Sequence, residues 1–239
     1  LIIITAGRNR KPGETRLDLI AGNSAILKNV VDQMKPHYTK GVIMIVSNPV
    51  DVLVYQCTKW MGLPNGMVFG TGCILDSSRF TRLIADYTRL NTEVVKATIV
   101  GEHGDAQIPI WSRVSIAGVP IQEYCENVGL RWGENIRKDI SDKVREMGAT
   151  IIKGKGRTHY GIATCVCYLA EAVLNQRLTI APVSTMFQGE YGIEDVCLSV
   201  PSIIGVNGVE KRLEERWAEE EFLAFRQAAE KMRNVLKTL

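Results

Sequence analysis

Short apolar runs rich in β-branched residues alternate with helix-like segments over the first part of this 239-residue chain. The first two runs lack the alternation of a solvent-facing strand, which indicates buried parallel strands. Between the runs, apolar residues recur at three- and four-residue steps, as on one face of a helix. The predicted strands are residues 1–5, 41–46, 67–69 and 94–100, and the predicted helices are residues 17–34, 50–61 and 75–87. This alternation predicts an α/β fold.

The pattern changes after residue 103, where strands and helices no longer alternate regularly. The predicted elements there are a hairpin of residues 111–116 and 119–121, helices at 132–153, 159–174 and 214–236, and strands at 180–188 and 196–204. Grouped strands followed by helices are typical of α+β structure. We therefore expect the second part of the chain to be α+β.

The first residues of the chain have the character of a buried strand. They have no preceding turn or polar lead, and the apolar run is too short and lacks the basic start of a signal peptide. Because an unpaired apolar strand is an aggregation hazard, we expect these residues to belong to a longer polypeptide.

The composition is that of an ordinary globular protein. Hydrophobic residues make up 46% of the chain and charged residues 23%, with 29 basic and 26 acidic side chains. No basic tract is present, and no apolar stretch has the length of a bilayer span. We therefore expect neither a nucleic acid nor a membrane as partner.

The six cysteines follow no regular spacing. Small buried thiols of this kind fit a reducing compartment, and we expect a cytoplasmic protein. Cys165 and Cys167 lie two residues apart in a predicted helix, so their side chains point to different faces. No other Cys or His pair has zinc-like spacing, and we predict no metal site.

Histidine 103 is the candidate general acid/base. It lies in Gly101-Glu102-His103-Gly104-Asp105, directly after the predicted strand 94–100, where a side chain can face a ligand crevice. Imidazole titrates near neutral pH, so it can take a proton from an alcohol and return it to a ketone. A buried or capping histidine is the alternative interpretation of this residue by itself.

Asp76 and Arg79 lie three residues apart and share one face of the predicted helix 75–87. A carboxylate can fix the tautomer of an imidazole, and a guanidinium can bind a substrate carboxylate through two parallel hydrogen bonds. A surface ion pair is the alternative interpretation of this spacing.

The stretch from Thr5 to Arg16 carries four basic side chains and two glycines between a strand and a helix. It is typical of a mobile loop that closes over an anion, with Arg10 and Arg16 delivered to the substrate on closure. A merely solvated loop is the alternative.

These motifs, in this order, resemble the lactate/malate dehydrogenase family over essentially the whole chain, and most closely its L-lactate dehydrogenases. The matching segments are residues 5–7, 11–19, 46–51, 70–79, 101–105, 183–186 and 198–201. The resemblance implies a partial Rossmann-type parallel sheet followed by an α+β catalytic domain. Residues 1–70 would be the C-terminal part of the NAD-binding domain, and residues 71–239 the catalytic domain. A homotetramer or dimer is also implied.

The resemblance further implies a role for each matched residue. His103 would exchange the proton, Asp76 would orient it, Arg79 would hold the carboxylate of a 2-oxo or 2-hydroxy acid, and Arg16 would polarise the reacting carbonyl. NADH would supply the hydride. Asn48 would lie near both the nicotinamide and the substrate oxygen, and Thr158 and Arg10 would contact the substrate. The other implied cofactor-binding residues are Thr5, Ala6, Gly7, Val46, Thr71 and Ile162.

The chain also departs from the family pattern. The glycine-rich G-x-G-x-x-G turn of the family is absent, so the choice of NAD over NADP rests on the resemblance, and a non-catalytic relative is a second hypothesis. The position before Lys11 holds Arg10, as in malate dehydrogenases, where lactate dehydrogenases usually have glutamine. The residues around Arg16, together with Thr158, Ile162 and residues 183–186, favour lactate.

Two further family comparisons complete the expectations. Thr81 and Lys96 stand where many bacterial lactate dehydrogenases bind a sugar bisphosphate through arginine and histidine, so we expect no activation by fructose 1,6-bisphosphate. A glycosidase that shares the dinucleotide fold would need Cys and His metal ligands near the site, and the sequence does not place them there.

Overall fold

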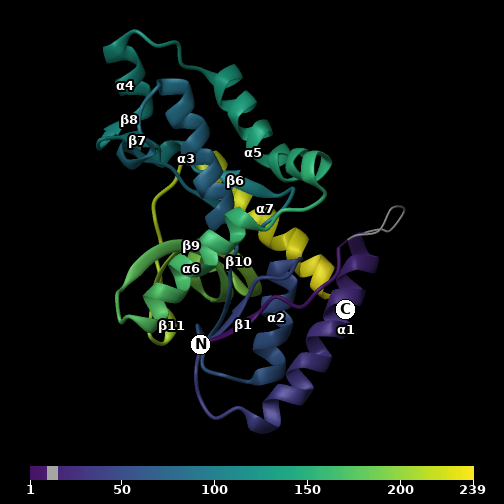
Figure 1. Ribbon diagram of the computed structural model, residues 1–239. Coiled ribbons are helices and arrows are strands. Elements are labelled where there is room, and N and C mark those ends of the chain that lie inside the picture. Colours follow the sequence, from purple (N-terminus) through teal and green to yellow (C-terminus); the bar gives the residue numbers. More distant parts are fainter. Residues whose placement is uncertain (10–15) are drawn as a thin grey trace.

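The structure is a computed structural model that describes residues 1–9 and 16–239. A mixed sheet forms the centre of the protein (Figure 1). Its strand order is β1-β2-β3-β9-β10-β5-β6, with β11 beside β10. The strands are β1 (Ile2–Ile4), β2 (Ile43–Ile45), β3 (Val68–Gly70), β5 (Ile99–Gly101), β6 (Gln107–Pro109), β9 (Thr179–Gln188), β10 (Glu194–Gly205) and β11 (Gly208–Arg212). A small second sheet contains β4 (Val95–Lys96), β7 (Ser115–Ile116) and β8 (Val119–Pro120).

Seven α-helices surround these sheets in the part of the chain that the structure describes. They are α1 (Arg16–Met34), α2 (Val50–Met61), α3 (Ile74–Thr88), α4 (Ile121–Val128), α5 (Glu134–Lys155), α6 (Tyr160–Leu174) and α7 (Glu219–Leu236). Helices α1 and α2 lie together at one end of the molecule, whereas α3, α4 and α5 extend from the other (Figure 1). The element order confirms the predicted α/β part followed by an α+β part.

The parallel part of the sheet is covered on both faces, which explains its uninterrupted apolar runs. Strands β1, β2 and β3 pair in parallel, and β3 then meets β9 in antiparallel orientation. Within β2, Ile43 and Ile45 pack in one apolar cluster with α1 and α2, while Met44 packs in another with α6. Successive side chains of a strand point to opposite faces, so both faces must be apolar here.

Strands β2 and β3 are buried throughout, as predicted. In β1, Ile4 is buried and Ile3 is 40% exposed. Strand β1 pairs with β2 along one of its edges.

The predicted strand 94–100 is two strands that belong to different sheets. A 3₁₀ turn (Thr92–Val94) comes first, β4 joins the small sheet, and β5 joins the large one after a break at residues 97–98. Likewise, residues 111–113 form a 3₁₀ turn, and only β7 and β8 form the predicted hairpin. An apolar run shows burial but not which sheet a strand joins, so the sequence could not reveal the break.

The last helix begins at Glu219, five positions later than predicted. The buried carboxylate of Glu221 accepts hydrogen bonds from the main chain of Ala218 and Ser112, and these contacts fix the helix start. Three elements were not predicted at all: α4, β6 and β11. Each is short, and β6 ends in proline while β11 is largely charged, so neither shows a strand pattern.

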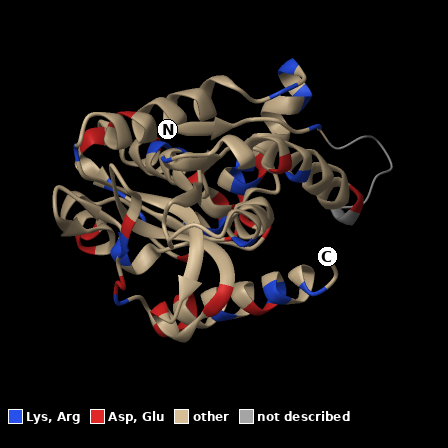
Figure 2. Cartoon of the chain, turned by 90° about the horizontal axis from the view of Figure 1, so that it is seen from below, with Lys and Arg blue, Asp and Glu red and all other residues tan. Residues whose placement is uncertain are grey.

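Acidic and basic residues are interspersed along the chain and do not gather in one region of the cartoon (Figure 2). Within residues 1–9 and 16–239, no helix combines the length and the apolar character that crossing a membrane requires.

Candidate active site

The centre of the site is a hydrogen bond between His103 and Asp76. His103 lies in the loop between β5 and β6, and its Nδ1 is 2.6 Å from Oδ2 of Asp76. The loop turns at Gly101, whose φ of +91° is costly for any residue with a Cβ atom. The predicted contact between the histidine and the carboxylate is therefore present.

Arg79 pairs with the other oxygen of the same carboxylate. Its Nη1 lies 3.1 Å from Oδ1 of Asp76, one helical turn away on α3. The side chain of Asp76 is 5% exposed and that of Arg79 is 13% exposed, so this is not a surface ion pair. Asp76 thus joins an imidazole and a guanidinium, and both cations retain N–H donors for a further anion.

The start of α3 is fixed by contacts with the long hairpin of β9 and β10. The main-chain N–H of Cys73 donates to Oγ of Ser199, 3.1 Å away in β10. Gly72 adopts a φ of +51°, and a Cβ there would overlap Ser199 Oγ and the main chain of Ser184. These contacts hold Asp76 and Arg79 in place relative to the central sheet.

The charges of this site shift the pKa values of Asp76 and His103. Burial by itself would raise the pKa of Asp76, but the hydrogen bond and charge of His103, with Arg79, hold that pKa below its usual value. Burial by itself would lower the pKa of His103, but the hydrogen bond and charge of Asp76 outweigh it, so the pKa is raised. A histidine that keeps its proton to higher pH is a suitable proton donor at neutral pH.

A second group of candidates lies at the carboxyl ends of β1, β2 and β3. Thr5, Ala6 and Gly7 follow β1 and are exposed, as is Asn48 after β2. Val46 donates its main-chain N–H to Ile4 in β1 (2.9 Å). In open α/β sheets, ligands bind in the crevice beside these strand ends.

Asn23, which the sequence analysis did not single out, ties these segments together. It is 1% exposed on α1, and its Nδ2 donates to the carbonyl oxygens of Asn48 (2.6 Å) and Arg8 (3.1 Å). Its Oδ1 accepts the N–H of Arg8 at 2.9 Å. A polar residue inside a helical pattern gave no sign that it joins two loops.

The remaining candidate residues differ in their burial and in their contacts. Thr71 is 3% exposed, and its N–H donates to Ile45 at the end of β2, 3.0 Å away. Ile162 packs in the same apolar cluster as Leu75, next to Asp76, so the start of α6 lies against the start of α3. Thr158 is exposed before α6, whereas the hydrogen bonds of His103 go to Asp51 and Asp76. Arg10 and the side chain of Arg16 lie outside the described residues.

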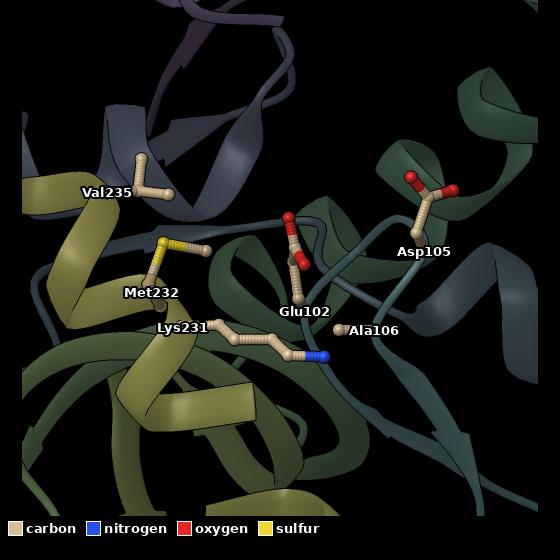
Figure 3. Close-up of a pocket in the computed structure, with 6 residues that line it drawn as sticks. All are labelled: Glu102, Asp105, Ala106, Lys231, Met232 and Val235. Carbon is tan, nitrogen blue, oxygen red and sulfur yellow. The ribbon is translucent and has the colours of Figure 1, made fainter. Parts of the chain in front are cut away.

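A cavity of about 170 Å³ lies behind the histidine loop rather than at these residues. Figure 3 shows Glu102, Asp105 and Ala106 of the loop on one side, and Lys231, Met232 and Val235 of α7 on the other. Among the described residues, no group of three or more His, Cys, Asp and Glu side chains is arranged to hold a metal ion.

Comparison with known proteins identifies the family. Residues 1–70 match the lactate/malate dehydrogenase NAD binding domain, and residues 73–239 match the lactate/malate dehydrogenase alpha/beta C-terminal domain. The chain belongs to the lactate/malate dehydrogenase family. The predicted class of enzyme, an oxidoreductase that acts on the CH–OH group of a 2-hydroxy acid, is thereby confirmed, as is the predicted fold class.

Similar members of this family are L-lactate dehydrogenases. The one from Thermoanaerobacterium saccharolyticum is 41% identical over all 239 residues, which span 77% of that protein. The one from Acetivibrio thermocellus is 37% identical over the whole chain and 75% of that protein. The ligand-bound structure of a minor L-lactate dehydrogenase from Enterococcus mundtii has a TM-score of 0.94 and 38% identity over 99% of this chain and 75% of that one.

The raised pKa of His103 predicts that the stability of this protein depends on pH. Because the folded pKa lies above the usual value of 6.5, the charged pair stabilises the fold fully below that pH, and its contribution is lost as pH rises through the folded pKa. Wild type should be more stable than His103→Asn. We expect this difference in the free energy of unfolding to be larger at about pH 5.5 than at about pH 9.

Urea unfolding of the two proteins at both pH values measures this difference. His37→Asn, at an exposed position after α1, is the matched control variant. A gain that is equal at both pH values would show that the charge of His103 does not contribute to the stability of the fold.

Proposed function

We propose that the chain is an NAD-dependent L-2-hydroxy acid dehydrogenase that interconverts pyruvate and L-lactate. The observation that carries this proposal is the single buried carboxylate of Asp76, which pairs with both His103 and Arg79. This arrangement combines a proton donor with an anion-binding guanidinium in one site, as reduction of a 2-oxo acid requires. It supports a catalytic protein over a non-catalytic relative.

In this mechanism Arg79 binds the substrate carboxylate. Its Nη1 is engaged by Asp76, and the remaining N–H groups of the guanidinium fork can form two parallel hydrogen bonds to a carboxylate. The substrate is thereby oriented with its carbonyl toward His103. Arg16, the first residue of α1, would polarise that carbonyl, and Thr158 would complete the substrate pocket.

His103 then exchanges the proton of the substrate oxygen. Its Nδ1–H donates to Asp76, so the proton that moves is held on Nε2. In the direction of pyruvate reduction, protonated His103 donates to the developing alkoxide, and in the reverse direction the neutral imidazole accepts the hydroxyl proton. Asp76 fixes the tautomer and stabilises the imidazolium.

The cofactor proposed for this site is NAD. The exposed residues Thr5, Ala6, Gly7 and Asn48, with Val46, lie where open parallel sheets bind ligands. A Cβ on Gly7 would come within 3.2 Å of the side chain of Ser47, so glycine allows the two loops to approach. Thr71 and Ile162 would line the nicotinamide pocket. When bound, the reduced nicotinamide supplies the hydride.

Oxaloacetate is the second candidate substrate. Arg10 would pair with its additional carboxylate, and an arginine facing the methyl group of pyruvate would lack a partner. Pyruvate is favoured because the similar proteins described above are L-lactate dehydrogenases at 37–41% identity.

We also propose two domains, residues 1–70 for NAD and residues 71–239 for the substrate, and a homo-oligomer, either a tetramer or a dimer. Large apolar side chains lie exposed at the start and end of α6 and just beyond it, as expected of a surface that a second subunit covers. Their exposed fractions are 58–71%, and they are Tyr160, Leu174, Leu178 and Ile180. Sedimentation should show a dimer or tetramer, and the mass of one chain would contradict the assembly.

The six free cysteines support a reducing, cytoplasmic location.

The substrate proposal is tested by kcat/KM for NADH oxidation with pyruvate and with oxaloacetate, on the full-length protein in one buffer. We expect the value for pyruvate to be higher. His103→Asn should lower kcat by about 10²- to 10⁴-fold, the usual contribution of general acid catalysis. Arg79→Lys should mainly raise the KM for pyruvate, since lysine lacks the fork geometry.

Arg82→Lys is the matched control for Arg79→Lys, because Arg82 is on the same helix with 68% of its side chain exposed. It should leave both kinetic constants near wild type. A higher kcat/KM for oxaloacetate would instead assign the malate reaction and give Arg10 the deciding role. Turnover of neither substrate would contradict the proposed function.

A further inference from the structure

A second buried carboxylate, that of Asp51, holds the main chain of the proton-transfer histidine. Asp51 lies in the first turn of α2 and is 2% exposed. Its Oδ2 accepts the main-chain N–H of His103 at 2.8 Å, across 52 positions of sequence. His103 is therefore bound by carboxylates from two helices: Asp76 of α3 through the ring, and Asp51 of α2 through the backbone.

The contact has the properties of an anchor. Burying a carboxylate is costly unless it is hydrogen-bonded, and a hydrogen bond to an ionised acceptor is roughly twice as strong as one between neutral groups. The neighbouring thiols of Cys73 and Cys197 are fully buried, so solvent is excluded from these surroundings. Burial raises the pKa of both thiols, and the negative charge of Asp51 raises it further.

The position of Asp51 in α2 connects two parts of the site. Helix α2 begins at Val50, directly after Asn48-Pro49, and Oδ1 of Asn48 accepts the N–H of Val50 at 3.3 Å. Asn48, the proposed neighbour of the substrate oxygen, therefore lies directly before the helical turn that carries the carboxylate bound to His103. Both Asn48 and the backbone of His103 are thus attached to the start of the same helix.

We propose that Asp51 is a positioning residue for proton transfer, which anchors the His103 backbone to the first turn of α2, directly after Asn48, and adds negative charge beside the imidazole. This inference rests on the proposed function, in which His103 exchanges the proton.

Among the side chains that the structure describes, the charges around His103 come from four parts of the fold. These are Asp76 and Arg79 on α3, Asp51 on α2, Glu102 and Asp105 on its own loop, and Lys231 on α7, which lines the cavity behind that loop (Figure 3). Burial lowers the pKa of His103, Asp76 raises it most, Asp51 raises it further and Arg79 lowers it. Removing the charge of Asp51 should therefore make His103 lose its proton at lower pH.

The test titrates His103 directly by NMR in the full-length protein. The signal that is missing from the spectrum of His103→Asn assigns the His103 Cε1–H resonance. Asp51→Asn keeps an acceptor for the backbone N–H and removes the charge. We expect the titration midpoint of His103 to fall by roughly 0.5 to 1 on the pH scale, less than for a directly paired charge. The alkaline limb of kcat/KM for pyruvate should move with it.

Asp51→Ala also removes the acceptor. We expect its kcat to fall by more than about tenfold, because small misplacements of a catalytic group are costly, while the KM for pyruvate, set by Arg79, changes little. Asp32→Asn, at an ion-paired position of α1 that is 58% exposed, is the control and should change neither readout.

The outcomes separate the two proposals. An unchanged His103 midpoint in Asp51→Asn would overturn the role of Asp51, even if Asp51→Ala were too unstable to assay. A near-normal kcat in folded Asp51→Ala would overturn the anchoring role. Absence of turnover in wild type would instead count against the proposed function, since the NMR titration does not depend on turnover.

Discussion

The site depends on neutralising one buried carboxylate. Asp76 is 5% exposed, and a charge with so little access to water is tolerated only when cations and hydrogen bonds compensate it. His103 and Arg79 supply both, one to each oxygen. The same pairing that makes the carboxylate stable also places a proton donor beside an anion-binding group, so the structural requirement and the chemistry coincide.

The fold brings these groups together from separate segments. Helix α3 carries Asp76 and Arg79, and Gly72 and Cys73, directly before its first residue, pack against the β9–β10 hairpin. His103 follows β5, the neighbour of β10 in the sheet. Helix α2 begins beside the parallel strands and reaches His103 through Asp51. The sheet thus serves as the common frame to which all three elements are attached.

Residues that share an element or a motif could be predicted from sequence. The three-residue spacing of Asp76 and Arg79 placed them on one helix face, and a histidine at a strand end indicated a crevice. Burial of β2 and β3 followed from their unbroken apolar runs. The partition of residues 94–100 between two sheets did not, because periodicity reports burial and not strand pairing.

Residues that act across the fold could not be predicted. Asp51 and Asn23 bind main-chain atoms of segments far away in sequence, and such contacts depend on packing rather than on spacing. Asp51 belongs to a matched motif, yet nothing in that motif indicates its partner. Thr158 is the reverse case: the family resemblance assigns it a role, whereas in the structure it is an exposed residue and the hydrogen bonds of His103 go elsewhere.

The central claim is that Asp76 acts on the reaction through His103. A double-mutant cycle at saturating pyruvate tests it most directly, with kcat measured for Asp76→Asn, His103→Asn and the double variant. The account predicts that Asp76→Asn lowers kcat by about 10²-fold or more in wild type and by less than about threefold in the His103→Asn background, as for residues that act as a unit. Losses that multiply in the double variant would contradict it.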